Sequence, residues 1–379
     1  MLKNQDGFSL VEMIVVMAIF VIVIAITGEA FNLVVKQASQ QSKTAESNIE
    51  GVLGLEMMRK DIASAGFGLP WSFTTAITYE EAADSETFAK VYNDKPSGVP
   101  RAVCGGNNLV SSDNSKLLAG TDYLVVKSSS IGSSQTAQRW SYMNYTGVTK
   151  PDTVTPYVWP KENLANGDRV IVIRVGLTSV FTKELVVSGG SFFTQYNLAG
   201  LPLGFQPTES KIAHYIYGVN SSTDLRMPFN RADYYVRIPG SADLPARCAP
   251  NTGVLYKATV NHGDGGLTEL PLLDCVADMQ VVYLLDSTSN GTMTETDTLS
   301  SLSPQELREQ LKAVKVYLLT HEGGKDRYYT YPSTTIAVGP PGTGRDFNLS
   351  TIVGTDYKYY RWKVYFLTVK PENVNIATQ

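Results

Sequence analysis

The chain has 379 residues and a formal net charge of −4, with 43% hydrophobic and 18% charged residues. This balance excludes a wholly disordered protein, and the small negative charge provides no bulk attraction to nucleic acid, so no nucleic-acid partner is expected. Tyr is abundant, with 21 residues, whereas Lys and Glu are sparse, which favours a strand-rich protein that folds outside the cytoplasm.

An apolar run as long as a membrane span begins close to the N-terminus. Phe8 to Ile26 covers 19 residues, about 28 Å as a helix at about 1.5 Å per residue, which is enough to cross a hydrocarbon core. In an ordinary secretory signal the cleavage site follows the apolar segment. Here the candidate site, between Gly7 and Phe8, precedes it, so cleavage leaves the run on the mature protein. Lys3 places a positive charge on the side expected to stay in the cytoplasm.

Glu12 is a carboxylate inside this apolar segment. On insertion scales such a group costs up to about 3 kcal/mol in a bilayer, so it is a candidate functional residue. The residues Gly7, Phe8, Ser9-Leu10-Val11 and Glu12 resemble the N-terminal motif of type IV pilins and type II secretion pseudopilins. The alternative is a signal anchor that happens to contain a glutamate.

The resemblance implies a role for each of three residues. Prepilin peptidase would cleave after Gly7 and N-methylate Phe8. Glu12 would then meet the Phe8 ammonium of a neighbouring subunit in the filament core. A buried carboxylate is tolerated beside a fixed cation, and such a pair sets register more than it adds stability.

The helix is predicted to continue to residue 66, as a rod of about 85 Å. No proline interrupts the sequence after residue 27 until Pro70, and Gly66 and Gly68 precede that residue as helix-ending signals. Apolar residues recur at steps of three and four and predict one face that packs on a head: Ala45, Ile49, Val52, Leu55, Met58 and Ile62. Three further glycines mark either bends or close packing: Gly28, Gly51 and Gly54.

Strand-like segments follow, separated by turn-rich spacers, and the first three of them are β-branched runs. The predicted strands are 123–127, 169–174, 184–187, 213–217, 232–237, 255–259, 276–285, 314–319 and 363–369. Pro304 to Lys312 is predicted as a short helix, with Ser303 as N-cap and Glu306 completing a capping box. The fold class is therefore α+β: a leader (1–7), a long helix (8–66, with 8–26 in the membrane or filament core) and a β-rich head (69–379) built on one antiparallel or mixed sheet. The spacers 73–107, 146–167 and 333–354 are long for a compact domain.

The head resembles that of PilW-like minor pilins. The similar segments, in chain order, are 58–62 with 65–68, 166–172, 253–257, 276–283, 313–319 and 361–373. One departure is Lys370-Pro371, where that family often has Leu-Arg. The related type II secretion pseudopilin J usually has a shorter head. The resemblance implies the type IV pilin fold and a structural subunit that prepilin peptidase processes.

Such a subunit spans the inner membrane once, with its head in the periplasm, and then joins an extracellular pilus near the tip. Its expected partners are major and minor pilins and the inner-membrane assembly platform. The alternatives are a pseudopilin of type II secretion and a tip adhesin or DNA-uptake subunit.

Three cysteines, without metal-ligand spacing, predict one disulfide and one spare thiol in a domain that folds outside the cytoplasm. Cys248 and Cys275 flank a predicted hairpin that turns at Asn261–Gly266, so this pair is favoured, with Cys104 free or exchanged for one of the two.

The segment from Asp286 to Asp297 has the spacing of a calcium loop. Oxygen ligands stand at Asp286, Thr288, Asn290, Thr294 and Asp297, with Gly291 at the sixth position. Thr288 replaces the usual carboxylate and no helix precedes the loop, so a solvated loop is favoured over calcium. No other cofactor is expected.

The sequence does not predict an enzyme. His214, His262 and His321 are scattered and are interpreted as structural. We find no nucleophile elbow, P-loop, HExxH or paired-carboxylate motif in a suitable context.

Overall fold

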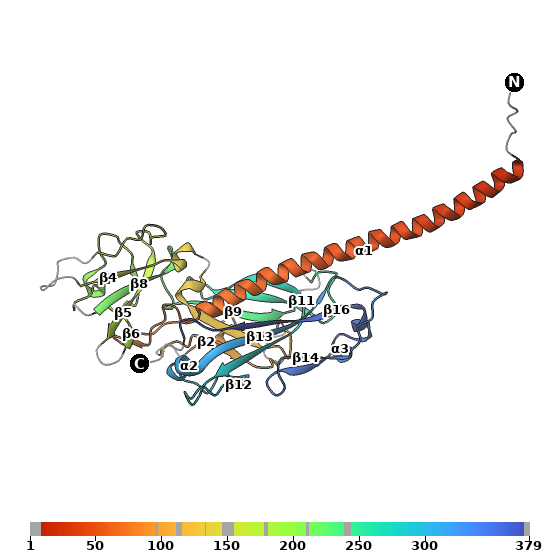
Figure 1. Cartoon of the computed structure of the whole chain (residues 1–379). Coiled ribbons are helices and arrows are strands. Elements are labelled where there is room, and N and C mark those ends of the chain that lie inside the picture. Colours follow the sequence, from red (N-terminus) through yellow and green to blue (C-terminus); the bar gives the residue numbers. More distant parts are fainter. Residues whose placement is uncertain are drawn as a thin grey trace, which may run out of the picture.

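The computed structural model describes residues 9–94, 98–110, 116–132, 134–145, 155–177, 181–209, 212–238 and 244–374. The expected leader 1–7 and Phe8 lie outside these ranges, as do the side chains of Ala45 and Ile49. The described chain forms a long N-terminal helix followed by a large, mainly antiparallel β head, as the α+β class predicts (Figure 1).

Helix α1 (Leu10–Ser64) has 55 residues, which gives a length of about 80 Å. Ser9 caps it through a capping box with Glu12. At its other end, Gly66 and Gly68 adopt left-handed backbone angles, with φ of 84° and 69°, which glycine accepts without steric cost. The N–H of Gly66 then donates to the carbonyl of Lys127 and leads the chain into the head. The N-terminal half of α1 projects away from the head as a gently curved rod (Figure 1).

Eight strands of the described chain form the larger sheet, in the order β16-β13-β11-β10-β9-β3-β2, with β12 attached to β11. All of these pairs are antiparallel. The strands are β2 (Val103–Gly106), β3 (Tyr123–Ser128), β9 (Asn230–Arg237), β10 (Gly253–Val260), β11 (Leu267–Leu285), β12 (Thr294–Thr296), β13 (Leu311–Glu322) and β16 (Arg361–Val369).

The head contains a second sheet, so the prediction of a single sheet was wrong. Among the described residues it has six strands, in the order β1-β6-β5-β8-β4, with β7 attached to β5. Only the β1–β6 pair of these is parallel. The strands are β1 (Ser72–Phe73), β4 (Trp140–Asn144), β5 (Arg169–Leu177), β6 (Phe181–Leu185), β7 (Thr194–Gln195) and β8 (Ile212–Asn220). This sheet forms the end of the head that lies away from the N-terminus of α1 (Figure 1).

The remaining elements are short. A two-stranded ribbon, β14 (Thr335–Val338) and β15 (Arg345–Asn348), occupies most of the spacer 333–354. The helix α2 (Pro304–Gln310) has the predicted capping box of Ser303 and Glu306. The other short helices are α3 (Leu349–Ile352) and the 3₁₀ helices η1 (Ala89–Tyr92), η2 (Ser129–Ile131), η3 (Gln135–Gln138), η4 (Leu203–Phe205) and η5 (Thr355–Tyr359).

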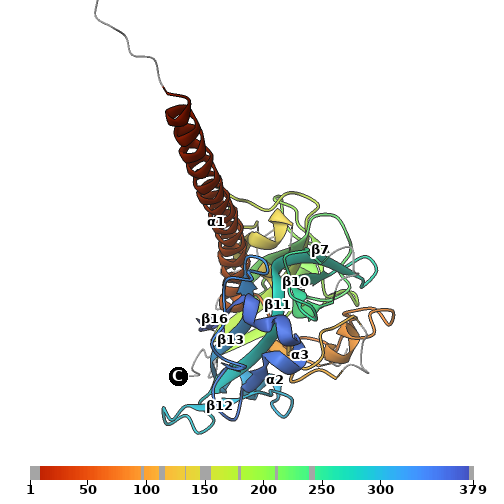
Figure 2. The ribbon, with the colours of Figure 1, turned by 90° about the vertical axis from the view of Figure 1, so that its right-hand side faces the viewer.

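The C-terminal part of α1 packs on the larger sheet, beside β11, β13 and β16 (Figure 2). Met58 and Ile62 are fully buried there, as the predicted apolar face requires. Val52, however, which the periodicity places on that face, is 64% exposed. A step of three residues turns a helix by about 300°, so three successive steps rotate the predicted face progressively away from the sheet.

Glycines take the place of Val52 in the contact. A Cβ at Gly54 would lie 2.5 Å from the carbonyl oxygen of Leu272 in β11, and one at Gly51 would lie 3.3 Å from a methyl carbon of Leu273. Of the two interpretations given by the sequence, these glycines therefore fit close packing. A Cβ at Gly28 would have no atom within 4 Å, so this glycine serves no such contact.

The spacer 73–107 is packed against the head through buried charges. Lys127 of β3 lies 2.8 Å from Glu81 and 2.6 Å from Asp94, and both carboxylates belong to the spacer. Arg231 of β9 lies 2.8 Å from Glu81 and 2.7 Å from Asp233. Each of these buried charges has an opposite charge beside it, which is the condition for burying ions at a tolerable cost. The network therefore fixes the spacer to the larger sheet.

Candidate assembly helix and sites on the head

The N-terminal half of α1 is apolar and bare. Leu10–Asn32, 23 residues, is the one helical segment among the described residues that is long and apolar enough to cross a membrane. None of its most apolar window is buried against the rest of the chain. Apolar surface of this extent is stable only in lipid or against other protein surfaces. This half of the helix is therefore available to a bilayer or to other subunits.

Glu12 lies in the first turn of this bare segment. Its Oε2 accepts a hydrogen bond of 2.9 Å from the backbone N–H of Ser9, so the carboxylate points back toward the start of the chain. A negative charge here also interacts favourably with the helix dipole. Gly7 and Phe8, the predicted cleavage and methylation residues, lie outside the described residues. In a single chain, Glu12 therefore caps its own helix, and its charge has no basic side chain beside it among the described contacts.

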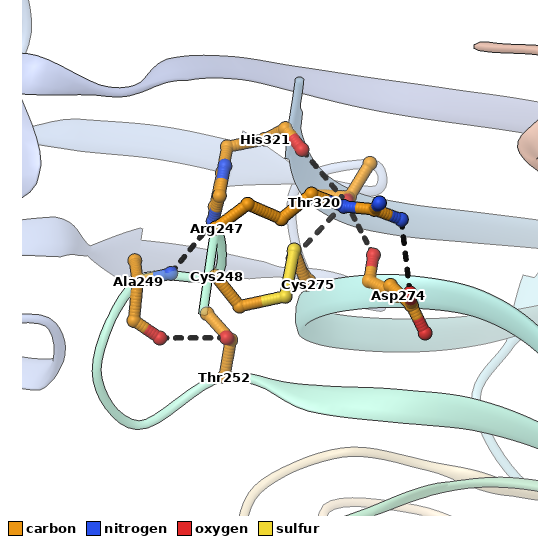
Figure 3. The surroundings of a disulfide bond; sticks show 8 residues. All are labelled: Arg247, Cys248, Ala249, Thr252, Asp274, Cys275, Thr320 and His321. Atoms are coloured by element: carbon orange, nitrogen blue, oxygen red, sulfur yellow. Dashed lines mark hydrogen bonds and ion pairs between the residues drawn. A yellow bond between two sulfur atoms is a disulfide. The ribbon is translucent and has the colours of Figure 1, made fainter. Parts of the chain in front are cut away.

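Cys248 and Cys275 form a disulfide, with their Cα atoms 4.8 Å apart (Figure 3). The predicted hairpin is present as β10 and β11, which pair across the turn Asn261–Gly266. Cys248 precedes β10, whereas Cys275 lies within β11 at a register shift, with a φ of 57°. The bond therefore joins the loop before the hairpin to the middle of its second strand. The sequence instead predicted that Cys275 stands at the end of a strand.

Polar contacts extend this junction to β13. The Nε2 of His321 accepts a hydrogen bond from the backbone N–H of Ala249 at 2.8 Å, and Thr320 donates to the carbonyl of Cys275 at 3.0 Å (Figure 3). Burial lowers the pKa of His321 to about 3, so this imidazole is neutral and acts as an acceptor. Arg247 pairs with Asp274 at 2.9 Å beside the disulfide. The site is structural, because each polar group named here is engaged within the head.

Cys104 is the free cysteine and is buried in β2. Burial raises the pKa of its thiol to about 11. The reactive species of cysteine is the thiolate, so this thiol is neither nucleophilic nor accessible. His214 and His262 are also buried, and burial lowers the pKa of both. The described residues contain no group of three or more His, Cys, Asp or Glu side chains that could hold a metal ion.

The predicted calcium loop is a hairpin turn between β11 and β12. The Oδ2 of Asp286 accepts from the N–H of Gly291 at 3.2 Å, and Asn290 caps the N–H of Thr292 at 2.8 Å. Thr294 lies in β12, and Asp297 accepts from the side chain of Asn107 at 2.7 Å. Three of the five predicted ligands, Asp286, Asn290 and Thr294, therefore lie in an ordinary hairpin, whereas Asp297 follows it and is bonded to Asn107, next to β2. Thr288 is part of the exposed turn.

Two features of the head were missed by sequence reasoning. Asp61 of α1 forms a buried contact with β9 and β10. Its position three residues after Met58, on the predicted apolar face, was the available signal, but no contact was predicted for it. A cluster of aromatic residues on the six-stranded sheet also had a local signal. Trp140-Ser-Tyr142 and Tyr157-Val-Trp159 each place two aromatic residues at alternate positions, which puts both rings on one face of an extended segment.

The N-terminal segment is the part of the chain that resembles known proteins. Residues 2–28 match the family model described as the prokaryotic N-terminal methylation motif, a span that includes Gly7, Phe8 and Glu12. No curated protein and no solved structure matches the chain. The motif supports a type IV prepilin-like protein, that is, a pilin or a pseudopilin.

This class has defined partners. The motif implies processing by prepilin peptidase and assembly with other pilins in a membrane machinery. The bare apolar half of α1 fits anchoring in the inner membrane and incorporation into a pilus. The motif points to a structural protein rather than an enzyme.

Proposed function

We propose that this protein is a structural minor pilin of a type IV pilus, similar to PilW-like minor pilins, that takes part in pilus initiation near the tip. The observation that carries the proposal is the division of α1. Its N-terminal half is bare and apolar, whereas Met58 and Ile62 in its C-terminal half are fully buried against the head. One helix thus joins a membrane or filament segment to a large exported domain.

Before assembly, Leu10–Asn32 would span the inner membrane, with the head in the periplasm and Lys3 on the cytoplasmic side. Prepilin peptidase would remove residues 1–7 and methylate Phe8. The helix would then leave the lipid and pack among the helices of sibling pilins on the inner-membrane assembly platform. The apolar surface that faces lipid in the membrane would face apolar side chains of neighbouring helices in the filament. The segment would therefore stay shielded from water during the transfer.

Glu12 would set the axial position of the helix. Its carboxylate would exchange the N–H of its own Ser9 for the Phe8 ammonium of a neighbouring subunit. In the low-dielectric core of a filament an unpaired carboxylate is costly. It is tolerated when the Phe8 ammonium of the neighbouring subunit lies beside it, which happens at one axial position. Subunits that are out of register would therefore be rejected.

The size of the head supports a low-copy position. Packed helices lie about 8–10 Å apart. The path of the larger sheet, from β16 to β2, has seven strands in the described chain, which makes it about 30 Å wide at about 4.8 Å per strand. Heads of this width would crowd one another along a shaft of closely packed helices, and this crowding is smallest at the tip. The role requires no cofactor, because packing and charge pairing supply the mechanism.

The test is the variant Glu12→Gln in the native host. Gln still accepts a hydrogen bond at this capping position, so the helix start is retained and only the charge is removed. We expect normal cleavage and methylation of Phe8 but no co-purification with sibling pilins and no surface pili. Glu29→Gln, in the same helical segment, is the matched control. Normal piliation with Glu12→Gln would refute the role of the charge.

A pseudopilin of a type II secretion system is the second candidate, because the matched motif occurs in that class as well. Deletion of the gene separates the two. Loss of pili with normal protein secretion supports the minor pilin, and loss of secretion with normal pili supports the pseudopilin.

A further inference from the structure

Five aromatic side chains gather on the six-stranded sheet and form what we call the distal aromatic patch: Trp140, Tyr142, Tyr157, Trp159 and Tyr215. Trp140 and Tyr142 lie on β4 and Tyr215 on the neighbouring β8. The rings contact one another, with centroids 4.8 Å apart for Trp140 and Trp159 and 5.0 Å for Tyr142 and Tyr157. The strands β4 and β8 belong to the end of the head opposite the N-terminus of α1 (Figure 1).

Hydrogen bonds among the patch residues, and from Asn163 beside them, hold the patch in place. The indole N–H of Trp159 donates to the carbonyl of Trp140 at 2.8 Å, and the backbone N–H of Tyr157 donates to the carbonyl of Tyr142 at 2.9 Å. Asn163 bonds both the N–H and the carbonyl of Trp159, at 2.8 and 2.6 Å. Rings fixed before binding lose little conformational entropy when a ligand arrives, which is a property of binding sites.

These rings are not the core of their sheet. The side chains on the opposite face of the same strands, Met143 and Ile216, are 1% and 0% exposed and fill a small core of their own. By contrast, Trp140, Tyr142, Trp159 and Tyr215 are half-buried and Tyr157 is 42% exposed. Clustered aromatic surface that remains in water marks an interaction site, because Trp and Tyr combine an apolar body with a polar edge.

A cavity of about 380 Å³ opens beside the Trp140–Trp159 pair. Its other lining residues are Gln138, Arg139, Pro160, Lys161 and Glu162. Cationic, anionic and neutral hydrogen-bonding side chains thus surround the two indole rings. Glu162 holds a left-handed backbone, with a φ of 62°, and a non-glycine residue in this conformation is a feature that recurs at ligand sites.

The combination favours one chemical class of ligand. A pyranose ring has an apolar face of C–H groups, which suits the electron-rich face of Trp or Tyr, and a rim of hydroxyls, which suits mixed donors and acceptors. Single-stranded nucleic acid also stacks on aromatic rings, but it requires a continuous basic groove. Here Arg139 and Lys161 stand beside Glu162, and the chain carries a net charge of −4.

We propose that the distal aromatic patch binds neutral glycans, with sugar rings stacked on Trp140, Tyr157 and Trp159. The hydroxyls of the glycan bond Gln138, Arg139 and Glu162 at the rim of the cavity. If the protein stands near a pilus tip, this site faces outward and the head recognises glycosylated surfaces. The binding itself does not depend on the proposed pilus role, since it belongs to the head and is measured on the purified protein.

The test uses the full chain in a detergent without a sugar head group, titrated separately with cellohexaose, chitohexaose and maltohexaose. Binding is followed by isothermal calorimetry and by Trp fluorescence. We expect at least one hexasaccharide to bind, and Tyr157→Ala and Trp159→Ala to weaken its affinity by about tenfold or more. Tyr328→Ala, which removes a ring that is 90% exposed elsewhere on the head, is the matched control and should leave the affinity unchanged.

Three results would overturn the proposal. One is the absence of binding by all three hexasaccharides in protein with a native circular dichroism spectrum. Another is glycan binding that Tyr157→Ala leaves unchanged. The third is binding of oligo-dT that the patch variants abolish while no glycan binds. If Trp159→Ala fails to fold, the affinities of Tyr157→Ala and Trp159→Phe are compared with that of the wild type instead. Trp159→Phe keeps a ring at the position.

Discussion

The carboxylate of Asp61, in α1, accepts a hydrogen bond of 2.5 Å from the hydroxyl of Tyr234, in β9. The ammonium of Lys257, in β10, lies 2.5 Å from the same carboxylate. Burial, together with the charge of Asp61, raises the pKa of Tyr234 well above its usual range, so the phenol keeps its proton and donates. The rod is thus joined to the larger sheet by a directional polar contact as well as by apolar packing, which fixes its rotation about its own axis.

Asp61→Ala should destabilise the head strongly. It leaves the Lys257 ammonium, whose side chain is only 12% exposed, and the buried Tyr234 hydroxyl without this partner. Breaking a buried ion pair from one side costs about 3–5 kcal/mol, and the partial exposure of Lys257 favours the lower end of this range. The measurement is urea unfolding of the full chain in detergent. Lys60→Ala, at the exposed neighbouring position, should change the free energy of unfolding by less than about 0.5 kcal/mol. Equal stabilities for the two variants would show that Asp61 does not hold the rod.

Gly54→Ala tests the closest approach of helix to sheet. The added methyl would lie 2.5 Å from the carbonyl oxygen of Leu272, a backbone atom that can move only with its strand. We expect a loss of about 1–3 kcal/mol, despite the better helix propensity of alanine. Gly28→Ala is the control, because nothing lies within 4 Å of its Cβ position. It should leave the unfolding of the head unchanged. A stabilised Gly54→Ala variant would contradict the packing.

Long apolar strands could be predicted from the sequence, and short ones could not. The runs within β3, β5, β8, β9, β10, β11, β13 and β16 contain β-branched or aromatic residues, and all eight are strands. For Glu184–Val187 only the first two residues lie in β6. The two-residue strands β1 and β7 are defined by pairing with distant partners, for instance Ser72 with Glu184. No periodicity can develop over two residues, so such strands depend on tertiary structure.

The same division applies to the sites. Glu12 could be found because a charge inside an apolar run is a local anomaly. The predicted hairpin between β10 and β11 brought the two cysteines near each other, although Cys248 lies in the loop before β10 and not in the paired ladder. The pairing of Lys127 with Glu81 joins residues far apart in sequence, and Asp61 meets Tyr234 across 173 positions. Contacts of this kind are set by how two sheets and a rod pack together, and one sequence contains no local sign of which residues meet.

Removal of the disulfide should destabilise the head by about 3.5 kcal/mol in the chain-entropy model, given a loop of this length. Its two cysteines are 27 positions apart. The expected result is that Cys248→Ser/Cys275→Ser lowers the urea midpoint and no longer responds to dithiothreitol, whereas the wild type does. Cys104→Ala should keep the response to the reductant, because Cys104 is not part of the bond. A midpoint in the wild type that the reductant does not shift would contradict a stabilising bond.

His262 should make the stability of the head fall in mild acid. Its Nδ1 accepts from the N–H of Arg226 at 3.2 Å and its Nε2 lies 3.1 Å from the side-chain oxygen of Asn230, contacts that suit a neutral ring. Burial lowers its pKa to about 4 from 6.5. Between these values the unfolded chain binds a proton that the folded chain does not, so stability falls as the pH drops from 7 toward 4.

The variant His262→Gln isolates this effect. Gln keeps one donor and one acceptor but does not titrate. Asp122 acts in the opposite direction, since burial raises its pKa to about 7 and lowering the pH relieves a buried charge, but this contribution is shared by both proteins and cancels in the comparison. Between pH 7.5 and pH 4.5 the wild type should lose about 2–3 kcal/mol more free energy of unfolding than the variant, at about 1.4 kcal/mol per pH unit. Parallel pH profiles from urea unfolding of the two full-length proteins would mean that His262 is protonated as readily in the folded head as in the unfolded chain.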